Sequence, residues 1–212
     1  MERPDRSALR YNPKKHDMND ILEIAAANQQ RAREVIRDSG LEAAWRSVGA
    51  EPNLVGSLRT GLLMTHRDID FHIYSSPLRL ADSFAAMARL AENSRIRSIT
   101  FNNLLDAPDQ CLEWHAWYAD ADDQLWQIDM IHMPKGSAYD GYFERVADRI
   151  AAVLTDRTRE TILRLKYETP EAEKIMGIEY YQAVLRDGVG TYTEFEAWRA
   201  AHPVTGILEW MP

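Results

Sequence analysis

The sequence predicts an α+β protein, with a mixed β-sheet flanked by helices and an α-helical C-terminal region. Three observations predict it. Residues 68–74 alternate polar and apolar side chains, which is the period of a half-buried strand. Residues 111–118 and 124–133 have strand-like patterns on either side of a turn. From Pro134 onward the apolar spacing becomes helical and is interrupted by Gly and Pro.

The composition is that of an ordinary globular protein. The 212 residues are 45% hydrophobic and 27% charged, which suffices for one core with a helical extension or for two small domains. We expect a flexible N-terminal arm over residues 1–18, an α/β core over 19–135 and a C-terminal helical region over 136–212. The net charge of -8 disfavours nucleic acid or an anionic lipid surface as a partner.

The compartment is predicted from cysteine use and from apolar runs. Cys111 is the single cysteine, so the chain forms no internal disulfide, and its strand-like surroundings predict a packed core residue. The first residues lack the apolar run of a signal peptide, and no stretch reaches the ~18 apolar residues of a membrane span. We therefore expect a cytoplasmic protein without a membrane segment.

Two helices should precede the first strand. Apolar spacing predicts a helix from Asn19 to near Gly40. Residues 39–42 fit a capping box for a short second helix with one apolar stripe. That stripe comprises Leu41, Ala44, Trp45 and Val48.

The elements after residue 74 should alternate before the chain becomes helical. A helix is predicted to start at residues 75–77, followed by a strand over 96–102 and a turn over 106–109. The next two strands should form an antiparallel hairpin around residues 120–123. Four helices are then expected, over 139–154, 156–167, 170–185 and 193–201. Four tryptophans are expected in the core: Trp45, Trp114, Trp117 and Trp126.

The strand over residues 68–74 places two carboxylates side by side. Strand geometry turns Ile69, Phe71 and Ile73 to one face, and Asp68 and Asp70 to the other together with His72 and Tyr74. Adjacent carboxylates repel, and a cation between them relieves the repulsion. Mg²⁺ prefers oxygen ligands and often binds through one or two carboxylates plus substrate phosphates. The pair therefore predicts a Mg²⁺ site.

A glycine and a serine precede these acids at the end of an apolar segment. Gly56 and Ser57 follow Leu54 and Val55, where a strand should give way to a turn. Glycine lets a phosphate approach the backbone closely, and the serine adds a hydroxyl donor. A phosphate-binding turn and a metal site are thus predicted on neighbouring segments.

Together these residues resemble the signature of the polymerase-beta-like nucleotidyltransferase superfamily. Val55-Gly56-Ser57, the spaced Asp68-x-Asp70 and a later strand acid, Asp129, match it over roughly residues 50–133. The resemblance implies a nucleotidyltransferase-like core and Mg²⁺-dependent transfer of a nucleoside monophosphate from a nucleoside triphosphate, such as ATP. Pyrophosphate would be released, and the acceptor would be a hydroxyl of a small molecule or a protein.

The resemblance also implies residue roles. Asp68, Asp70 and Asp129 would hold one or two Mg²⁺ ions, with Mn²⁺ as a substitute, and Asp129 would help to deprotonate the acceptor. The nucleotide-binding residues would be Gly56, Ser57, Arg59 and Lys166. The nucleobase, the acceptor and the oligomeric state stay open.

Other interpretations of these residues remain. The acids could form a solvated strand face, or the chain could be a non-catalytic nucleotide-binding or antitoxin-like protein that keeps the fold. A two-metal phosphohydrolase is a third possibility, which the Gly-Ser spacing does not support. The sequence lacks a protein-kinase catalytic loop, an EF-hand loop, a Walker loop and the histidine spacing of a zinc site.

Overall fold

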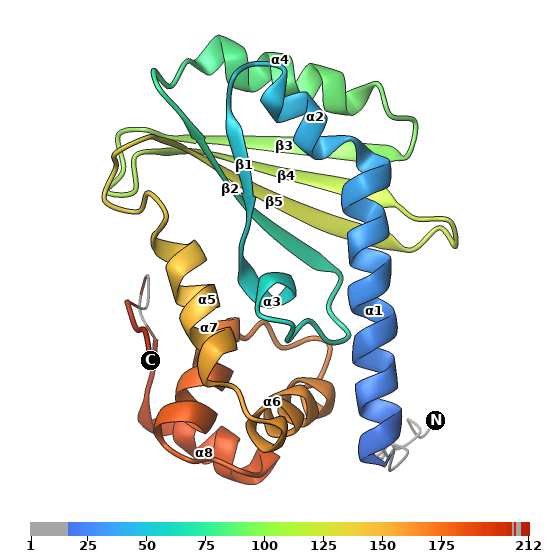
Figure 1. The fold of residues 1–212 in the computed structure, drawn as a ribbon, viewed down its shortest axis with the longest axis vertical. Helices are drawn as coiled ribbons and strands as arrows, with labels where there is room; N and C mark the ends of the chain where they lie inside the picture. The colour runs from blue at the N-terminus through green and yellow to red at the C-terminus, as the bar shows by residue number, and fades with distance from the viewer. Residues whose placement is uncertain (1–16, 205, 207–208) are drawn as a thin grey trace, which may run out of the picture.

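The computed structural model describes residues 17–204, 206 and 209–212. These residues form one five-stranded sheet with helices on both of its faces (Figure 1). Residues 1–16, most of the expected N-terminal arm, lie outside the described residues. The α+β class predicted from the sequence is confirmed.

The sheet is mixed and has the strand order β1-β2-β5-β4-β3. β2 and β5 are parallel, and the other neighbours are antiparallel, including the predicted β4–β5 hairpin. The strands are β1 Glu51–Leu54, β2 Asp68–Ser75, β3 Ile96–Leu104, β4 Cys111–Ala119 and β5 Leu125–Pro134. The central strands β2 and β5 come from different parts of the chain, so the middle of the sheet joins distant segments.

The helices form two groups. α2 and α4 lie above the sheet in Figure 1, α5 to α8 lie below it, and the long α1 runs beside both groups. The helices before residue 100 are α1 Met18–Ser39, α2 Leu41–Arg46, α3 Gly56–Arg59 and α4 Leu80–Ala91. The later ones are α5 Tyr142–Val153, α6 Asp156–Glu168, α7 Gly177–Tyr181, the π-helix η1 Gln182–Arg186 and α8 Tyr192–Ala201.

The boundary between α1 and α2 differs from the prediction. α1 begins where the Asp17 carboxylate accepts hydrogen bonds from the backbone N–H groups of Asn19 and Asp20, at 2.8 and 3.1 Å. It ends at Gly40, which has φ 75° and also occupies the N-cap of α2. The predicted capping box is therefore wrong, because the cap residue has no side chain with which to cap.

Two predicted helices start later than expected. α4 begins at Leu80, because β2 continues through Ser75, whose carbonyl accepts a hydrogen bond from Lys135 N–H at 2.9 Å. In the segment predicted as a helix over 170–185, regular helix begins only at Gly177. There the Glu179 carboxylate accepts from the Met176 N–H at 3.0 Å and caps a new helix start.

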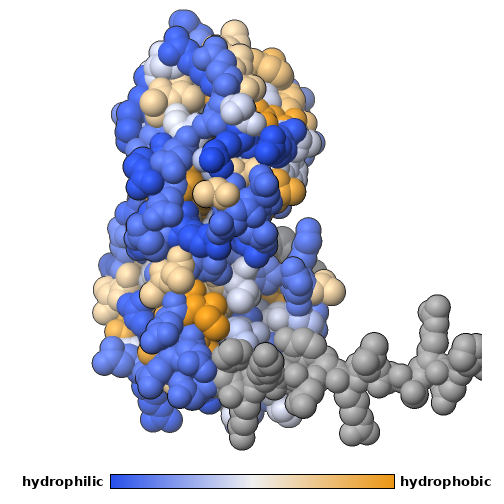
Figure 2. Space-filling model, turned by 90° about the vertical axis from the view of Figure 1, so that its right-hand side faces the viewer, coloured by the Kyte–Doolittle hydropathy of each residue, from blue (hydrophilic) through white to orange (hydrophobic). Residues whose placement is uncertain are grey.

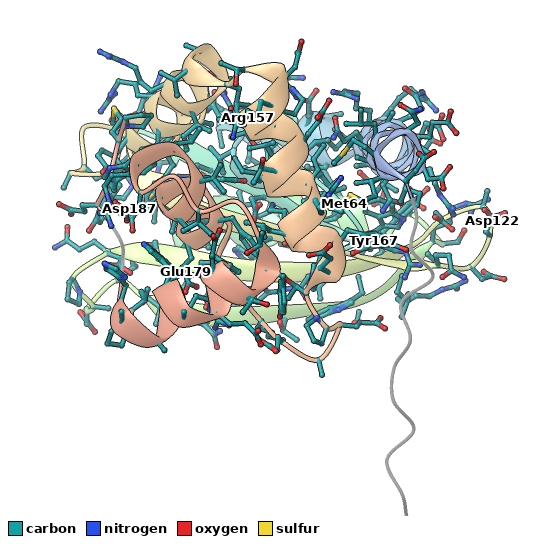
Figure 3. The ribbon with its side chains drawn as sticks, turned by 90° about the horizontal axis from the view of Figure 1, so that it is seen from below. Met64, Asp122, Arg157, Tyr167, Glu179 and Asp187 are labelled. Atoms are coloured by element: carbon teal, nitrogen blue, oxygen red, sulfur yellow. The ribbon has the colours of Figure 1, made fainter. Side chains whose placement is uncertain are left out.

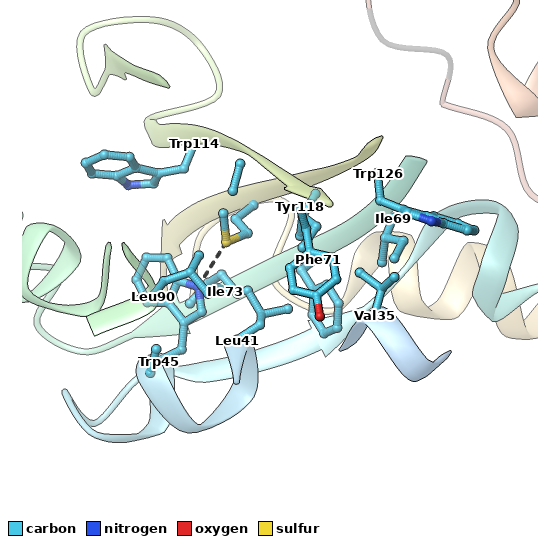
Figure 4. Close-up of a cluster of buried hydrophobic side chains, with 14 of the residues drawn as sticks. Val35, Leu41, Trp45, Ile69, Phe71, Ile73, Leu90, Trp114, Tyr118 and Trp126 are labelled. Atoms are coloured by element: carbon cyan, nitrogen blue, oxygen red, sulfur yellow. Dashed lines mark hydrogen bonds between the residues drawn. The ribbon is translucent and has the colours of Figure 1, made fainter. Parts of the chain in front are cut away.

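One hydrophobic cluster fills the space between the sheet and α2, α4 and the second half of α1 (Figure 4). Trp45 is fully buried in it, and its indole N–H contacts the Met130 sulfur at 3.3 Å. Trp114 and Trp126 are buried, as predicted, and so is Cys111 in a smaller cluster. The predicted core is therefore confirmed except at Trp117, which is only partly buried.

A second cluster joins α5 to α8 to the first half of α1. Leu62 and Met64, from the segment between α3 and β2, are buried in it. The face that carries α1 is mostly hydrophilic (Figure 2). Within the described part of the chain, no helix has the length and apolar character needed to cross a membrane.

Replacing Trp45 by Ala should test the first cluster. We expect a loss of about 3–5 kcal/mol in the free energy of unfolding, because a large, fully buried side chain leaves a cavity. Urea unfolding at equilibrium measures it. The control is Leu80→Ala at a position that is 43% exposed, expected to cost about 0.5 kcal/mol or less. Equal losses in the two variants would contradict this view of the core.

Candidate active site

The acids come together through the register of the parallel β2–β5 pair. Asp70 lies opposite Asp129, and Asp68 lies opposite Gln127. Because neighbouring strands are about 4.8 Å apart, these side chains form one group on the same face of the sheet. We call this the acidic face. Ile69, Phe71 and Ile73 are fully buried on the other face, as the alternation predicted.

The acidic face is open only at one end. Further along β2, His72 and Tyr74 are buried against α5, where the His72 and Phe143 rings meet edge to face at 4.8 Å. Burial lowers the pKa of His72 to about 4, so this ring is neutral at pH 7. Tyr74 donates a hydrogen bond to the Glu144 carboxylate at 3.1 Å. The helices thus cover the second half of β2 and leave Asp68 and Asp70 half-buried.

Gly56 is required where it packs against Asp70. It begins α3 with φ 66°, and a Cβ built on it would lie 1.9 Å from the Asp70 Oδ2. The Val55 N–H donates to the Asp70 carbonyl at 2.9 Å, which holds the two segments in register. The Gly-Ser pair recognised in the sequence therefore contacts the acid pair directly.

Asp70 is the most perturbed acid of the group. Burial, together with the negative charges of Asp68 and Asp129, raises the pKa of its carboxyl to about 7. Lys166 and a hydrogen bond from the Ser57 backbone N–H act in the opposite direction. A buried carboxylate beside two others lacks positive charge, and a cation would supply it.

The acid pair fits a divalent cation. The Asp68 Oδ1 is buried and has no hydrogen-bond partner among the described residues. No three His, Cys, Asp or Glu side chains of the described residues converge as a ready-made metal cage. Mg²⁺ does not need one, because it commonly binds through one or two carboxylates and completes its shell with water and phosphate oxygens.

Asp129 is held by two neighbours that the sequence reasoning did not assign. The His115 Nδ1 lies 2.5 Å from the Asp129 Oδ1, and the Gln127 amide donates to the same oxygen at 2.8 Å. His115 is the register partner of Asp129 in the β4–β5 hairpin. The signal in the sequence is the predicted hairpin, which in the structure closes over residues 120–124 and so pairs His115 with Asp129.

The two predicted basic residues have different surroundings. Lys166 is buried beneath the cleft, and its ammonium donates to the Leu62 carbonyl at 3.0 Å. Arg59 points to α5, where its guanidinium binds both oxygens of Asp148 at 2.8 and 2.9 Å. The structure brings Lys166 to the site, whereas Arg59 is not among the residues that line it.

A cleft of about 850 Å³ opens over the acidic face. Its walls come from α3, from the strands β2, β4 and β5, and from the helical C-terminal region. Seen from below, this helical region crosses the sheet, and Met64 lies beside α6 (Figure 3). Trp117 lines this cleft, so its predicted place in the core is wrong: it belongs to the same face as Gln127, its register partner. The cleft combines acids, a buried lysine and apolar walls.

Solved structures with a similar fold are known. The chain is similar to a chain of the GLD-2 and GLD-3 non-canonical poly(A) polymerase complex, with a TM-score of 0.56 and 10% identity. It is also similar to the Cid1 poly(U) polymerase with MgGTP bound, with a TM-score of 0.57 and 13% identity. A cytoplasmic RNA terminal U-transferase gives a TM-score of 0.53 and 14% identity. The chain shares the fold of these poly(A) and poly(U) polymerases.

The extent of the match is limited to the fold. The three alignments each cover 79% of this chain. They cover 57% of the chain from the GLD-2 and GLD-3 complex, 54% of Cid1 and 52% of the terminal U-transferase, so this protein spans a little over half the length of these neighbours. No protein-family model matches the sequence, and no curated protein matches it. The resemblance inferred from Gly56, Ser57 and the three acids is confirmed at the level of the fold.

Replacing Gly56 by Ala tests the contact with Asp70. Gly49→Ala is the matched control, because Gly49 has φ 78° but open space around its Cβ position. We expect the control to lose about 1–2 kcal/mol of stability and Gly56→Ala to lose about 1–3 kcal/mol more. Urea unfolding measures both. In an Asp70→Ala background, the extra loss of stability of Gly56→Ala over Gly49→Ala should shrink. If this extra loss stayed unchanged, the clash with the Asp70 carboxylate would be ruled out as its cause.

The buried Asp70 predicts a pH dependence of stability. Its folded pKa of about 7 exceeds the ordinary value of 3.8, so between these values the folded state binds more protons. The free energy of unfolding contributed by Asp70 therefore falls as pH rises, and the loss is complete above pH 7. Relative to Asp70→Asn, metal-free wild type should lose about 2–3 kcal/mol between pH 5 and pH 8. Denaturant titrations with a chelator at both pH values measure this difference. Parallel stability curves for the two proteins would contradict it.

Proposed function

We propose that the protein is a metal-dependent nucleotidyltransferase that moves a nucleoside monophosphate from a nucleoside triphosphate to a hydroxyl group. One observation carries the proposal. Asp70 lies opposite Asp129 on parallel strands, next to Gly56 at the start of α3, and Asp68 on the same face has a buried oxygen without a hydrogen-bond partner among the described residues. The fold, shared with poly(A) and poly(U) polymerases, supports the same reaction class.

The residues that would hold the metal are the three acids. Asp68 and Asp70 would bind one or two Mg²⁺ ions, or Mn²⁺, and Asp129 would complete the acceptor side. Bound there, the metal supplies positive charge that neutralises the triphosphate as negative charge shifts during transfer. One structural neighbour holds MgGTP, which supports this choice of ion.

The protein's own groups would position the reactants. Ser57, at the first turn of α3, would contact the terminal phosphates, with Gly56 leaving room beside Asp70. Lys166 would offset negative charge at the same place, and Arg59 would reach phosphate by exchanging its Asp148 partner. Such positioning supplies much of the rate in phosphoryl transfer.

Asp129 would act on the acceptor. It would accept the proton of the attacking hydroxyl as that oxygen bonds to the α-phosphorus. The bond between the α-phosphorus and the bridging oxygen then breaks, and pyrophosphate leaves with the electron pair. The products are the nucleotidylated acceptor and pyrophosphate.

The acceptor is proposed to be a small hydroxylated molecule or a protein hydroxyl. A net charge of -8 opposes a long polyanion. The cationic side chains that line the cleft within the described residues are Arg67, Lys166 and Lys174, few for a nucleic-acid channel. A cleft of about 850 Å³ has the size of small-molecule sites.

A non-catalytic nucleotide-binding protein is the second candidate. The observation that favours it is that Asp129 already accepts hydrogen bonds from His115 and Gln127 through one oxygen. Such a protein would bind a metal and a nucleotide at Asp68 and Asp70 without releasing pyrophosphate.

A thermal-shift scan with ATP, GTP, CTP and UTP, with and without Mg²⁺, tests the donor site. A nucleotide at a hundredfold its dissociation constant stabilises by ~2.7 kcal/mol, which for this chain length means a rise of roughly 5–11 °C. We expect a Mg²⁺-dependent rise that Asp70→Asn abolishes. Asp123→Asn, 88% exposed in the β4–β5 turn, is the control and should keep it.

Turnover is then measured as pyrophosphate release with a panel of hydroxylated acceptors. Asp68→Ala and Asp70→Ala should each lower kcat at least about a thousandfold, since each removes a metal ligand. Unimpaired turnover in either variant would refute the mechanism. Metal-dependent nucleotide binding with no pyrophosphate release for any acceptor would favour the second candidate.

A further inference from the structure

A line of polar side chains crosses the sheet and ends at Asp129. The Asn102 amide, on the edge strand β3, donates to the Glu113 Oε2 at 2.9 Å. The other Glu113 oxygen lies 3.4 Å from the His115 Nε2, and the His115 Nδ1 lies 2.5 Å from the Asp129 Oδ1. The line therefore runs from β3 through β4 to β5, beside Asp70 on β2.

The geometry at Asp129 distinguishes its two oxygens. The Oδ1 accepts from His115 and from Gln127, which approach from neighbouring positions of the same face. No hydrogen bond from another described residue is found at the Oδ2. Both His115 and Asp129 are partly buried, with side chains 22% and 23% exposed, so water competes little for the shared contact. The carboxylate is thus fixed by one oxygen and available through the other.

Fixing this carboxylate has an energetic reason. Asp70 lies directly opposite Asp129 and repels it whenever both are ionised, so a freely rotating Asp129 side chain would then turn away from it. Two donors on the Oδ1 hold the side chain against this repulsion before any ligand arrives. Partners of this kind orient carboxylates and imidazoles at metal sites.

We propose that His115 is a positioning residue that holds Asp129 with its Oδ2 directed to the acceptor-side metal and to the attacking hydroxyl. Gln127 assists it from β5, and Glu113 lies beside the other ring nitrogen. The inference rests on the proposed function, since it assigns a role to a neighbour of one proposed metal ligand.

The test compares His115→Leu, which removes the donor, with His115→Asn, whose amide nitrogen takes about the place of the imidazole Nδ1. Mn²⁺ binding to the whole chain is measured by calorimetry with an α,β-methylene nucleoside triphosphate, which cannot react. We expect the dissociation constant of the weaker Mn²⁺ site to rise about tenfold to a hundredfold in His115→Leu and to be restored in His115→Asn. Affinity for the nucleotide itself should not change.

A matched control and a second variant make the outcome decisive. Thr100→Ala alters the register partner of His115 on β3 and should leave Mn²⁺ binding unchanged. Gln127→Leu removes the other donor and should weaken Mn²⁺ binding in the same direction, whether or not His115→Leu folds. With an active acceptor, His115→Leu should lower kcat and leave the nucleotide KM unchanged.

The inference is overturned if His115→Leu binds Mn²⁺ as wild type does. It is also overturned if His115→Asn is as impaired as His115→Leu, because the hydrogen bond would then not be the cause. A wild-type chain that binds no Mn²⁺ with nucleotide would instead refute the proposed function, so the two failures are distinguishable.

Discussion

The candidate site depends on one constraint, the parallel register of β2 with β5. This register sets Asp70 opposite Asp129 and, on the other face, buries Ile69 and Ile128 in the first hydrophobic cluster. A slip by one residue would turn the acids into that cluster and the isoleucines to the cleft. The large free energy of apolar burial therefore fixes the position of the carboxylates, which on their own would repel each other.

The charged groups of the site lower the stability of the fold because they are buried, and neighbouring groups partly offset this cost. Asp70 is buried beside two other acids, and Lys166 is buried on α6 with a carbonyl as its partner. Each group would be more stable in water. Asp70 is held in place by three neighbours. Gly56 packs closely against it, the backbone N–H of Ser57 donates a hydrogen bond to it, and Lys166 supplies an opposite charge. Such local conflicts are expected where a fold is shaped to receive a charged ligand.

Local patterns predicted much of this structure because local forces determine those parts. Alternation along β2 identified the acidic face, and the 120–123 turn identified the hairpin. The failures have different causes, some local and one non-local. Trp117 was assigned to the core because it is aromatic, yet strand alternation places it with Gln127 in the cleft. The helix expected over 170–185 was interrupted because Glu179 caps a later start. His115 could not be assigned to the site from its own strand, because its contact is with Asp129 on the neighbouring strand β5.

The long helix α1 has a consequence for how the cleft admits ligands. Its 22 residues extend about 33 Å, and it packs Ile21 and Ala25 into one cluster and Ala32 and Val35 into the other. The walls of the cleft belong to these same two clusters, so swinging them apart as rigid bodies would bend or strip a continuous helix. The two walls are thus spliced by one rod, and a ligand meets a cleft whose sides are joined along the length of α1.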